Sequence, residues 1–150
     1  MLWGMPRLTD LSKLDKESLP PLPKSDAPDL TVIVPGCNEE DSIEATLRSL
    51  LASTGLRLEI VAVDDRSTDR TGERMDAMAA EAAKSGPHTL VVIHNQALPQ
   101  GWLGKPHALK LGTDRATAPW LLMTDADVTF APDALEQMCI RDRIRSPDGN

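Results

Sequence analysis

Short apolar runs alternate with longer amphipathic segments along most of the chain. Four runs have the length and aliphatic content of buried strands, at residues 30–34, 58–63, 89–93 and 120–124. Between the first two runs, Ile43, Leu47 and Leu50 recur at helical spacing. Because strand–helix–strand units place successive strands parallel, this alternation predicts an α/β fold with a Rossmann-like, mostly parallel sheet flanked by helices.

Capping and turn residues mark the expected ends of the helices. Asn38 is a candidate cap for the first helix, and Gly55 is the expected stop. Ser67, Thr68 and Asp69 are candidate caps for the second helix. A third helix is expected after the loop at residues 95–104, and Trp120 is expected to pack against the core.

The two ends of the chain depart from this regular pattern. Residues 1–29 contain a proline-rich stretch at positions 20–28 that holds the backbone extended, so we interpret this part as a leader or linker. Residues 30–137 form the predicted domain. The run Met-Cys-Ile-Arg-Asp-Arg then resembles a translated sequencing-transposon end, so we interpret residues 138–150 as a non-native tail of a truncated product. The alternative is a genuine charged helix.

Charge and cysteine content narrow the classes of function. The 150 residues carry 16 Lys and Arg against 23 Asp and Glu, a net charge of −7, so we expect no nucleic-acid partner. The two cysteines are too far apart in sequence for a C-x-x-C pair, which disfavours a disulfide framework or a zinc site. No apolar run approaches the roughly 18 residues that span a bilayer. With no signal-peptide pattern either, we expect a cytoplasmic protein.

Polar residues follow three of the four predicted strands directly. They are Pro35, Asn38 and Glu39 after the first strand, Asp64 and Asp65 after the second, and Asp125 and Asp127 after the fourth. Ligands of parallel sheets bind outside the carboxyl ends of the strands. The sequence therefore predicts that these clusters contribute to one site.

Asp125 and Asp127 carry the most chemical information. Residues i and i+2 of an extended chain point the same way, so the two carboxylates can converge. Converging carboxylates repel unless a proton or a cation lies between them. Such oxygen ligands suit Mg²⁺ or Mn²⁺, which keep positions open for phosphate oxygens. A solvated turn is the alternative interpretation, because Asp favours turns.

Asp64 and Asp65 are adjacent, so we expect only one of them to face a ligand while the other caps the next helix or orders the loop. A carboxylate at this place can accept hydrogen bonds from a base N–H or from ribose hydroxyls. A turn with a helix cap is the simpler alternative.

The phosphate-binding patterns of other α/β enzymes are absent. There is no G-x-G-x-x-G after the first strand, and Lys105 is followed by Pro106 rather than by the Ser or Thr of a P-loop. An acidic domain without a glycine cradle needs a cation and a lysine to hold a diphosphate. Lys105 is the candidate, with an ordinary loop lysine as the alternative, and His107 is expected on a helix surface.

Together these residues resemble the family 2 glycosyltransferases, which have the GT-A fold. The matching motifs are Pro-x-x-Asn-Glu at residues 35–39, Val-Asp-Asp-x-Ser-x-Asp-x-Thr at 63–71, Gly-Lys-x-x-Ala-Leu-x-x-Gly at 104–112 and Asp-x-Asp at 125–127. They occur in this order and cover about residues 30–137. Residues 101–105 also resemble the hopanoid-associated glycosyltransferase branch.

The resemblance implies a binding site for a nucleotide-sugar donor, in the first instance a UDP-sugar. It implies that Asp64 and Asp65 contact the nucleoside, and that Asp125 and Asp127 bind ribose and a divalent cation, Mn²⁺ or Mg²⁺, on the diphosphate. It places Lys105 near the donor, together with Pro35, Asn38 and Glu39. Many relatives have an aromatic residue at the position of Cys37, so a stacking platform for the base is not expected here.

The resemblance also implies that the general base and the acceptor-binding part lie beyond the metal motif. We therefore nominate no catalytic residue and expect donor binding with feeble transfer. The acceptor is open, a lipid or a polysaccharide, and membrane association, at the inner face, is expected only through missing regions. Two alternatives remain: a nucleotidyltransferase, whose glycine-rich, Arg-containing loop residues 35–39 do not supply, and a fragment that does not fold.

Overall fold

The structure, a computed structural model, describes residues 26–84 and 86–145. In this part of the chain four strands alternate with four helices. They are β1 (Leu30–Gly36), α1 (Ile43–Leu51), β2 (Leu58–Asp65), α2 (Thr71–Ala82), β3 (Thr89–Asn95), α3 (Gly104–Arg115), β4 (Trp120–Met123) and α4 (Ala134–Arg145). The α/β class predicted from the apolar pattern is confirmed.

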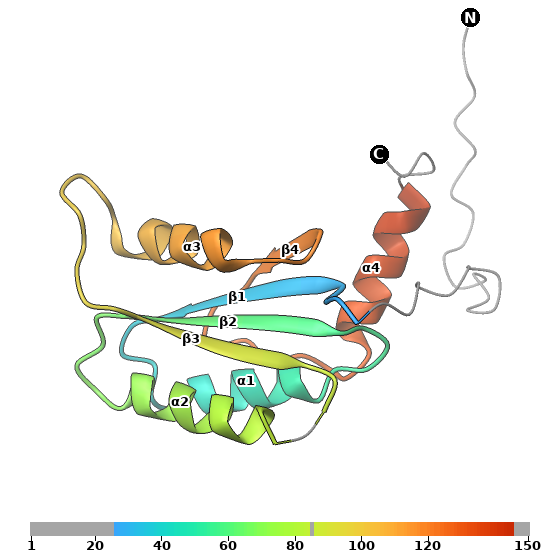
Figure 1. Cartoon of the computed structure of the whole chain (residues 1–150), viewed down its shortest axis with the longest axis horizontal. Coiled ribbons are helices and arrows are strands. Elements are labelled where there is room, and N and C mark those ends of the chain that lie inside the picture. Colours follow the sequence, from blue (N-terminus) through green and yellow to red (C-terminus); the bar gives the residue numbers. More distant parts are fainter. Residues whose placement is uncertain (1–25, 85, 146–150) are drawn as a thin grey trace, which may run out of the picture.

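The four strands form one parallel sheet in the order β3-β2-β1-β4. Helices α1 and α2 cover one face, α3 covers the other, and α4 stands at the end where the strands begin (Figure 1). The chain therefore changes direction across the sheet between β1 and β4. Parallel α/β sheets bind ligands beside such a switch, at the carboxyl ends of the strands.

Two hydrophobic clusters hold the layers together. The larger lies between the sheet and α1, α2 and α4, and it includes Val32 and Val34 of β1 and Leu47 of α1, all fully buried. The smaller lies under α3 and includes Val61 and Ala108. Both faces of β1 and β2 are thus covered, which explains why these strands are continuous apolar runs rather than alternating ones.

Two local expectations of the sequence differ in outcome. The cap position of α2 is Arg70, but the preceding Asp69 still serves the helix start, since its Oδ1 accepts from the backbone N–H of Thr71 at 2.9 Å. Asn38 does not cap α1, which begins at Ile43. Asn38 instead has a left-handed backbone (φ +58°), and its Oδ1 accepts from the backbone N–H of Thr68 at 2.8 Å. The side chain therefore joins two loops, and this competes with a helix cap.

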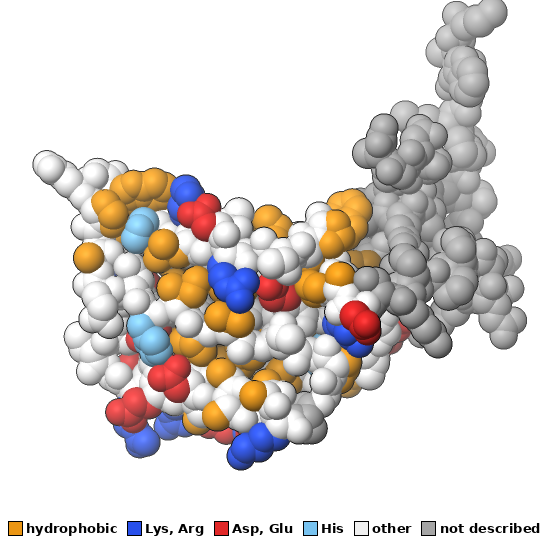
Figure 2. Space-filling model, in the orientation of Figure 1, with side chains coloured by type: hydrophobic (Ala, Val, Ile, Leu, Met, Phe, Trp, Pro, Cys, Tyr) orange, Lys and Arg blue, Asp and Glu red, His pale blue; other side chains and the backbone are white. Residues whose placement is uncertain are grey.

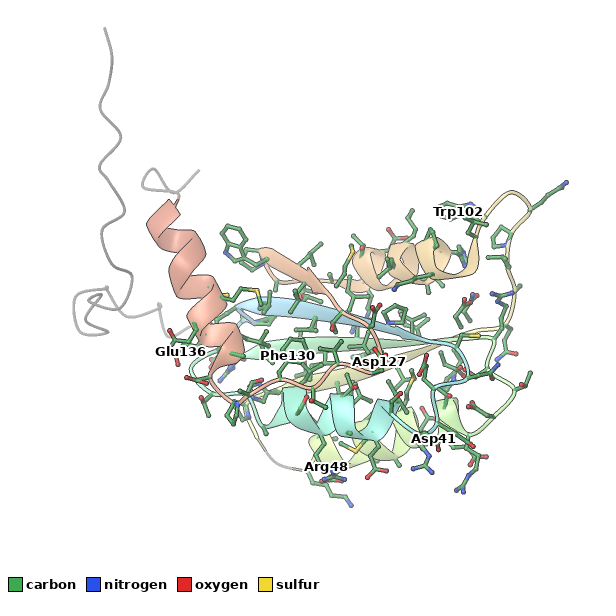
Figure 3. The ribbon with its side chains drawn as sticks, turned by 180° about the vertical axis from the view of Figure 1, so that it is seen from behind. Asp41, Arg48, Trp102, Asp127, Phe130 and Glu136 are labelled. Atoms are coloured by element: carbon green, nitrogen blue, oxygen red, sulfur yellow. The ribbon has the colours of Figure 1, made fainter. Side chains whose placement is uncertain are left out.

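The prediction that Trp120 packs against the core is wrong. Trp120 begins β4, which pairs only with β1 among the described strands, and the residue is 60% exposed. After β4 the chain crosses behind the sheet, past Phe130, to α4 (Figure 3). Helix α4 continues to Arg145, so the proposed non-native origin of residues 138–150 stays a prediction. No helix of the described part is long and apolar enough to cross a membrane.

A buried carboxylate ties β1, β2 and the α3–β4 connection together. Glu59 is 5% exposed, and its Oε2 accepts from Thr31 Oγ1 at 2.6 Å and from the backbone N–H of Thr117 at 2.8 Å. Burial raises the pKa of Glu59, but these two hydrogen bonds and the nearby Arg115 outweigh it, so the pKa lies below its usual range. Ionised Glu59 therefore stabilises the strand pair that leads to the site.

Replacing Glu59 by glutamine is expected to lower the free energy of unfolding at pH 7 by about 1–3 kcal/mol, the range for a hydrogen-bonded buried charge. Because the folded pKa is lowered, the stabilisation is present above about pH 4.3, the ordinary glutamate value, and is lost as pH falls through the folded pKa. Urea titrations at several pH values check this. The gap between wild type and Glu59→Gln should shrink on acidification, and a constant gap would contradict the assignment.

Candidate functional site

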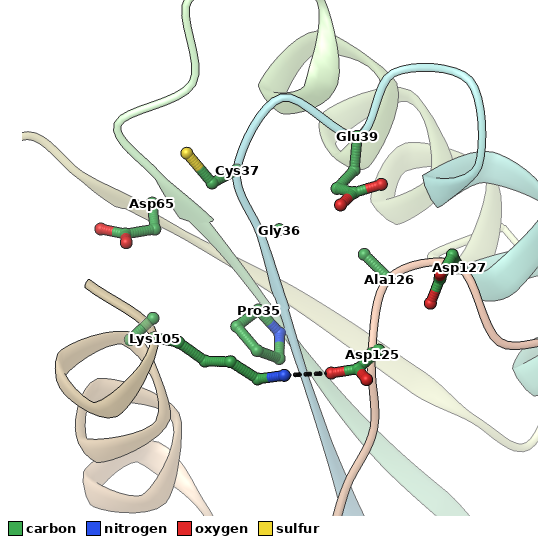
Figure 4. Close-up of a pocket in the computed structure, with 10 residues that line it drawn as sticks. Pro35, Gly36, Cys37, Glu39, Asp65, Lys105, Asp125, Ala126 and Asp127 are labelled. Carbon is green, nitrogen blue, oxygen red and sulfur yellow. Dashed lines mark hydrogen bonds and ion pairs between the residues drawn. The ribbon is translucent and has the colours of Figure 1, made fainter. Parts of the chain in front are cut away.

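A cavity of about 310 Å³ opens at the carboxyl ends of β1 and β2 (Figure 4). Its walls come from these strand ends, from the first turn of α3 and from the loop after β4. The lining residues are Pro35, Gly36, Cys37, Glu39, Asp65, Lys105, Ala108, Asp125, Ala126 and Asp127. Asp65 and Asp127 thus share one hollow although they follow different strands. This is the convergence that the sequence predicted.

The turn after β1 is fixed by its contacts with α2. Gly36 lies so close to that helix that a Cβ would come within 3.0 Å of Met75 Cε. The backbone N–H of Glu39 donates to Thr71 Oγ1 at 2.8 Å. The Glu39 side chain is oriented in turn by Ser42, whose Oγ donates to Glu39 Oε2 at 2.9 Å. The result is a rigid wall that carries a carboxylate beside the loop of Asp127.

Asp65 provides the most strongly oriented carboxylate of the cavity. Its Oδ1 accepts from Arg66 Nε at 3.0 Å and from Asn95 Nδ2 at 2.7 Å, and its Oδ2 accepts from Arg66 Nη2 at 3.1 Å. The side chain is only 6% exposed. The hydrogen bonds from Arg66 lower the pKa of Asp65, burial opposes them, and Asn95 adds to the lowering. Asp65 is therefore a fixed, ionised acceptor of hydrogen bonds.

Two residues expected at the site do not line the cavity. Asp64 turns to the other side of β2, where its Oδ1 accepts from the backbone N–H of Ser67 and its Oδ2 lies 3.1 Å from His94 Nδ1. The hydrogen bond to Asp64, followed by that to Asp76, raises the pKa of His94. Asn38 is occupied with the loop of Thr68. Of the adjacent pair, Asp65 faces the cavity and Asp64 orders the loop.

Asp125 and Asp127 lie on the loop after β4, and they differ in that only Asp125 has a side-chain partner among the described residues. Lys105 of α3 reaches across the cavity mouth and pairs with Asp125 (Figure 4). The Asp127 carboxylate has no hydrogen-bond or ion-pair partner within residues 26–84 and 86–145. Lys105 and Asp125 are both more than half exposed, and exposed ion pairs contribute little stability. They can therefore separate readily when a ligand enters.

The donor set fits a divalent cation that arrives with a ligand. Within the described residues, no three His, Cys, Asp or Glu side chains gather closely enough to hold a metal ion. Mg²⁺-like cations often bind through one or two carboxylates and complete their shell with water and phosphate oxygens. Asp125 and Asp127 supply such a pair at the mouth of the cavity, so a diphosphate would be needed to complete the coordination.

The sequence did not single out two residues that hold the site together. Arg66 and Asn95 both bind the Asp65 carboxylate. A signal for Asn95 existed, since the parallel register pairs it with Asp65 at the last position of β2 and β3. Cys37 lines the cavity and is exposed. On the face drawn in Figure 2, basic and acidic side chains are interspersed rather than gathered by sign.

Comparison with known proteins gives a consistent match. The model of "Glycosyl transferase family 2" matches residues 31–139. The succinoglycan biosynthesis protein ExoO of Rhizobium meliloti is 31% identical over 114 residues, which are 76% of this chain and 30% of that protein. The 4,4'-diaponeurosporenoate glycosyltransferase of Staphylococcus haemolyticus is 32% identical over 120 residues, 77% of this chain and 30% of that protein. The chain thus spans about a third of the length of these relatives.

Solved structures agree with the sequence comparison. The mannosyltransferase PcManGT of Pyrobaculum calidifontis, in complex with GDP-Man and Mn²⁺, superposes with a TM-score of 0.62 at 31% identity, over 79% of this chain and 33% of that one. S. aureus TarS in complex with UDP-GlcNAc superposes with a TM-score of 0.57 at 27% identity, over 75% of this chain and 30% of that one.

Proposed function

Because the chain belongs to glycosyl transferase family 2, we propose that residues 30–137 are the donor-binding part of an enzyme that transfers a sugar from a nucleoside-diphosphate sugar. One observation carries the proposal. Asp65 at the end of β2, Lys105 in the first turn of α3, and Asp125 and Asp127 after β4 line a single cavity at the carboxyl ends of the strands. A nucleoside diphosphate needs a hydrogen-bond acceptor for its nucleoside and positive charge for its phosphates, and this cavity offers a place for both.

Each residue then has a defined role. Asp65 accepts hydrogen bonds from the base or the ribose, because its carboxylate is ionised and fixed. Asp125 and Asp127 would hold Mn²⁺ or Mg²⁺, with Asp125 also within reach of ribose. A bound cation would stabilise the charge that develops on the departing diphosphate. Lys105 exchanges its partner Asp125 for a phosphate oxygen, and Pro35 and Glu39 shape the wall opposite.

The nature of the donor rests on the neighbours. Solved structures that superpose on this chain contain UDP-GlcNAc in one case and GDP-Man with Mn²⁺ in another. We propose a UDP-sugar as the donor of this protein, with a GDP-sugar as the alternative that titration of both nucleotides distinguishes. The exposed Cys37 offers no ring for a base to stack on, so recognition of the base falls to hydrogen bonds at Asp65.

The acceptor and the general base are proposed to come from sequence that this chain does not contain. The chain spans about a third of its curated relatives, and we nominate no general base among its residues. We therefore expect this chain to bind donor and to transfer sugar feebly. The relatives' names point to a polysaccharide or a lipid acceptor, and the motif at residues 101–105, which resembles the hopanoid-associated branch, favours a lipid. The donor site would face the cytoplasm, with membrane attachment in sequence beyond this chain.

Calorimetric titration of UDP and of GDP, in Mn²⁺ and again in excess chelator, tests the proposal. We expect Mn²⁺ to tighten binding of the preferred nucleotide by at least about tenfold, because two carboxylates otherwise repel the diphosphate. Equal affinity with and without Mn²⁺ would reject the cation-assisted site. A cooperative thermal transition without binding of either nucleotide would reject the donor-binding function while leaving the fold intact.

A further inference from the structure

A polar chain leads from the floor of the cavity to the first turn of α3. Asn95, at the end of β3, is 8% exposed and donates from Nδ2 to Asp65 Oδ1 at 2.7 Å. The same Nδ2 lies 3.3 Å from His107 Nδ1. The ring of His107 in turn meets Trp102 edge-on, with centroids 5.4 Å apart. Asp65, Asn95 and His107 therefore connect β2, β3 and α3 without a break.

The chemistry of the donors fixes the direction of both hydrogen bonds. An ionised carboxylate can only accept, so the Asn95 atom beside Asp65 must be the amide nitrogen. Nδ2 carries two hydrogens, one for Asp65 and one for His107. His107 Nδ1 must then be an acceptor, which places the ring hydrogen on Nε2. The Asn95 amide nitrogen thus holds one group on each side.

The first residue of α3 packs directly on the same carboxylate. A Cβ at Gly104 would lie 2.8 Å from Asp65 Oδ2 and 2.8 Å from Arg66 Nη2, so any larger residue at this position would displace the Asp65–Arg66 pair or α3. Lys105 follows at once and carries its ammonium group to the mouth of the cavity. The position of Lys105 therefore depends on how the first turn of α3 is seated against Asp65.

We propose that Asn95 and His107 are positioning residues of the donor site: they seat the first turn of α3 against Asp65 and so place Lys105 at the diphosphate. The ligand in this inference is the nucleoside diphosphate of the proposed function, and the inference rests on that function. Neither side chain lines the cavity, so both act through the residues that do. His107 is not the free surface histidine that its helical position suggested.

Variants of His107 separate positioning from general stability. His107→Phe keeps a ring against Trp102 but removes the acceptor, and His107→Gln restores an acceptor through its side-chain oxygen. With Mn²⁺ and whichever of UDP and GDP wild type binds more tightly, we expect His107→Phe to weaken binding roughly three- to tenfold, within the range for loss of one hydrogen bond. His107→Gln should stay within about twofold of wild type.

Lys105→Ala completes a double-mutant cycle. If His107 acts by placing Lys105, then His107→Phe should cause no further loss in the Lys105→Ala background. Additive losses, or a loss in His107→Gln as large as in His107→Phe, would overturn the proposal. Unchanged affinity in His107→Phe would overturn it as well.

Hydrogen exchange on the ligand-free protein gives a readout that needs no nucleotide. Peptides covering residues 96–110 should exchange faster in His107→Phe and in Asn95→Ala than in wild type, whereas His107→Gln should match wild type. If these variants exchanged faster but wild type bound no nucleotide, the structural link from Asn95 to α3 would be supported and the donor-binding function would be rejected. Unchanged exchange in His107→Phe would reject the link itself.

Discussion

Asp127→Asn is expected to lower the Mn²⁺-dependent affinity for the preferred nucleoside diphosphate by roughly 30- to 100-fold. Asn has nearly the same shape but no charge, and loss of one charged ligand corresponds to about 2–3 kcal/mol. The Asp127 carboxylate is exposed and has no partner among the described residues, so the substitution removes nothing that holds the fold. Calorimetric titration with Mn²⁺ present measures the effect.

Asp133→Asn is the matched control, because Asp133 is also exposed and lies outside the cavity. It should bind nucleotide and Mn²⁺ as wild type does. In chelator, Asp127→Asn should bind at least as tightly as wild type, since the lost interaction runs through the cation and one carboxylate that repels the diphosphate is gone. If Asp127→Asn bound as tightly as wild type in Mn²⁺, Asp127 would not be a cation ligand.

The largest effect on stability is expected from Gly112→Val. Gly112 lies in α3, where a Cβ would come within 2.4 Å of Ile33 Cγ2 on the fully buried β1. A branched side chain must push α3 off the sheet. Overpacking of this severity costs about 3 kcal/mol or more. For a chain of this length the melting temperature should fall by about 6–12 °C.

Two further variants separate the clash from helix propensity. Lys110→Val places the same residue at an exposed position of the same helix and should cost less than about 1 kcal/mol. Gly112→Ala combined with Ile33→Ala should be less destabilised than the sum of the two single variants, because the second change makes room for the first. Strict additivity, or a stable Gly112→Val, would show that α3 does not pack on Ile33 through this glycine.

The strands and helices could be predicted because periodicity is a local property of the sequence. Residues 30–34 and 58–63 read as buried strands because helices cover both faces of the sheet at these positions. The failure at Asn38 has a physical cause. Its side chain finds a better partner in Thr68, 30 residues away, than in the helix that follows it. The prediction for Trp120 was wrong because an aromatic residue in a predicted strand suggests burial, and the sequence does not show whether a further strand pairs with that strand.

The site was predictable as far as topology decides it. Parallel strands bring their carboxyl ends to one edge, so the order of strands and helices along the sequence is enough to assign Asp65, Asp125 and Asp127 to one place. Adjacent residues of a strand point to opposite faces of the sheet, so only one of Asp64 and Asp65 can face the cavity. Which of them does so depends on the register of β2 and could not be predicted from the sequence. The role of Asn95 could not be predicted from the sequence, because it depends on the pairing of Asn95 with Asp65 in the sheet and on a contact with His107 of α3.

A crystal grown with Mn²⁺ and the nucleoside diphosphate that binds more tightly would test the central claim most directly, through its anomalous difference map. A manganese peak should lie within coordinating distance of Asp127 and of the diphosphate, with the nucleoside reaching the Asp65 end of the cavity. A nucleotide bound elsewhere, or bound here with the manganese away from Asp125 and Asp127, would contradict the account.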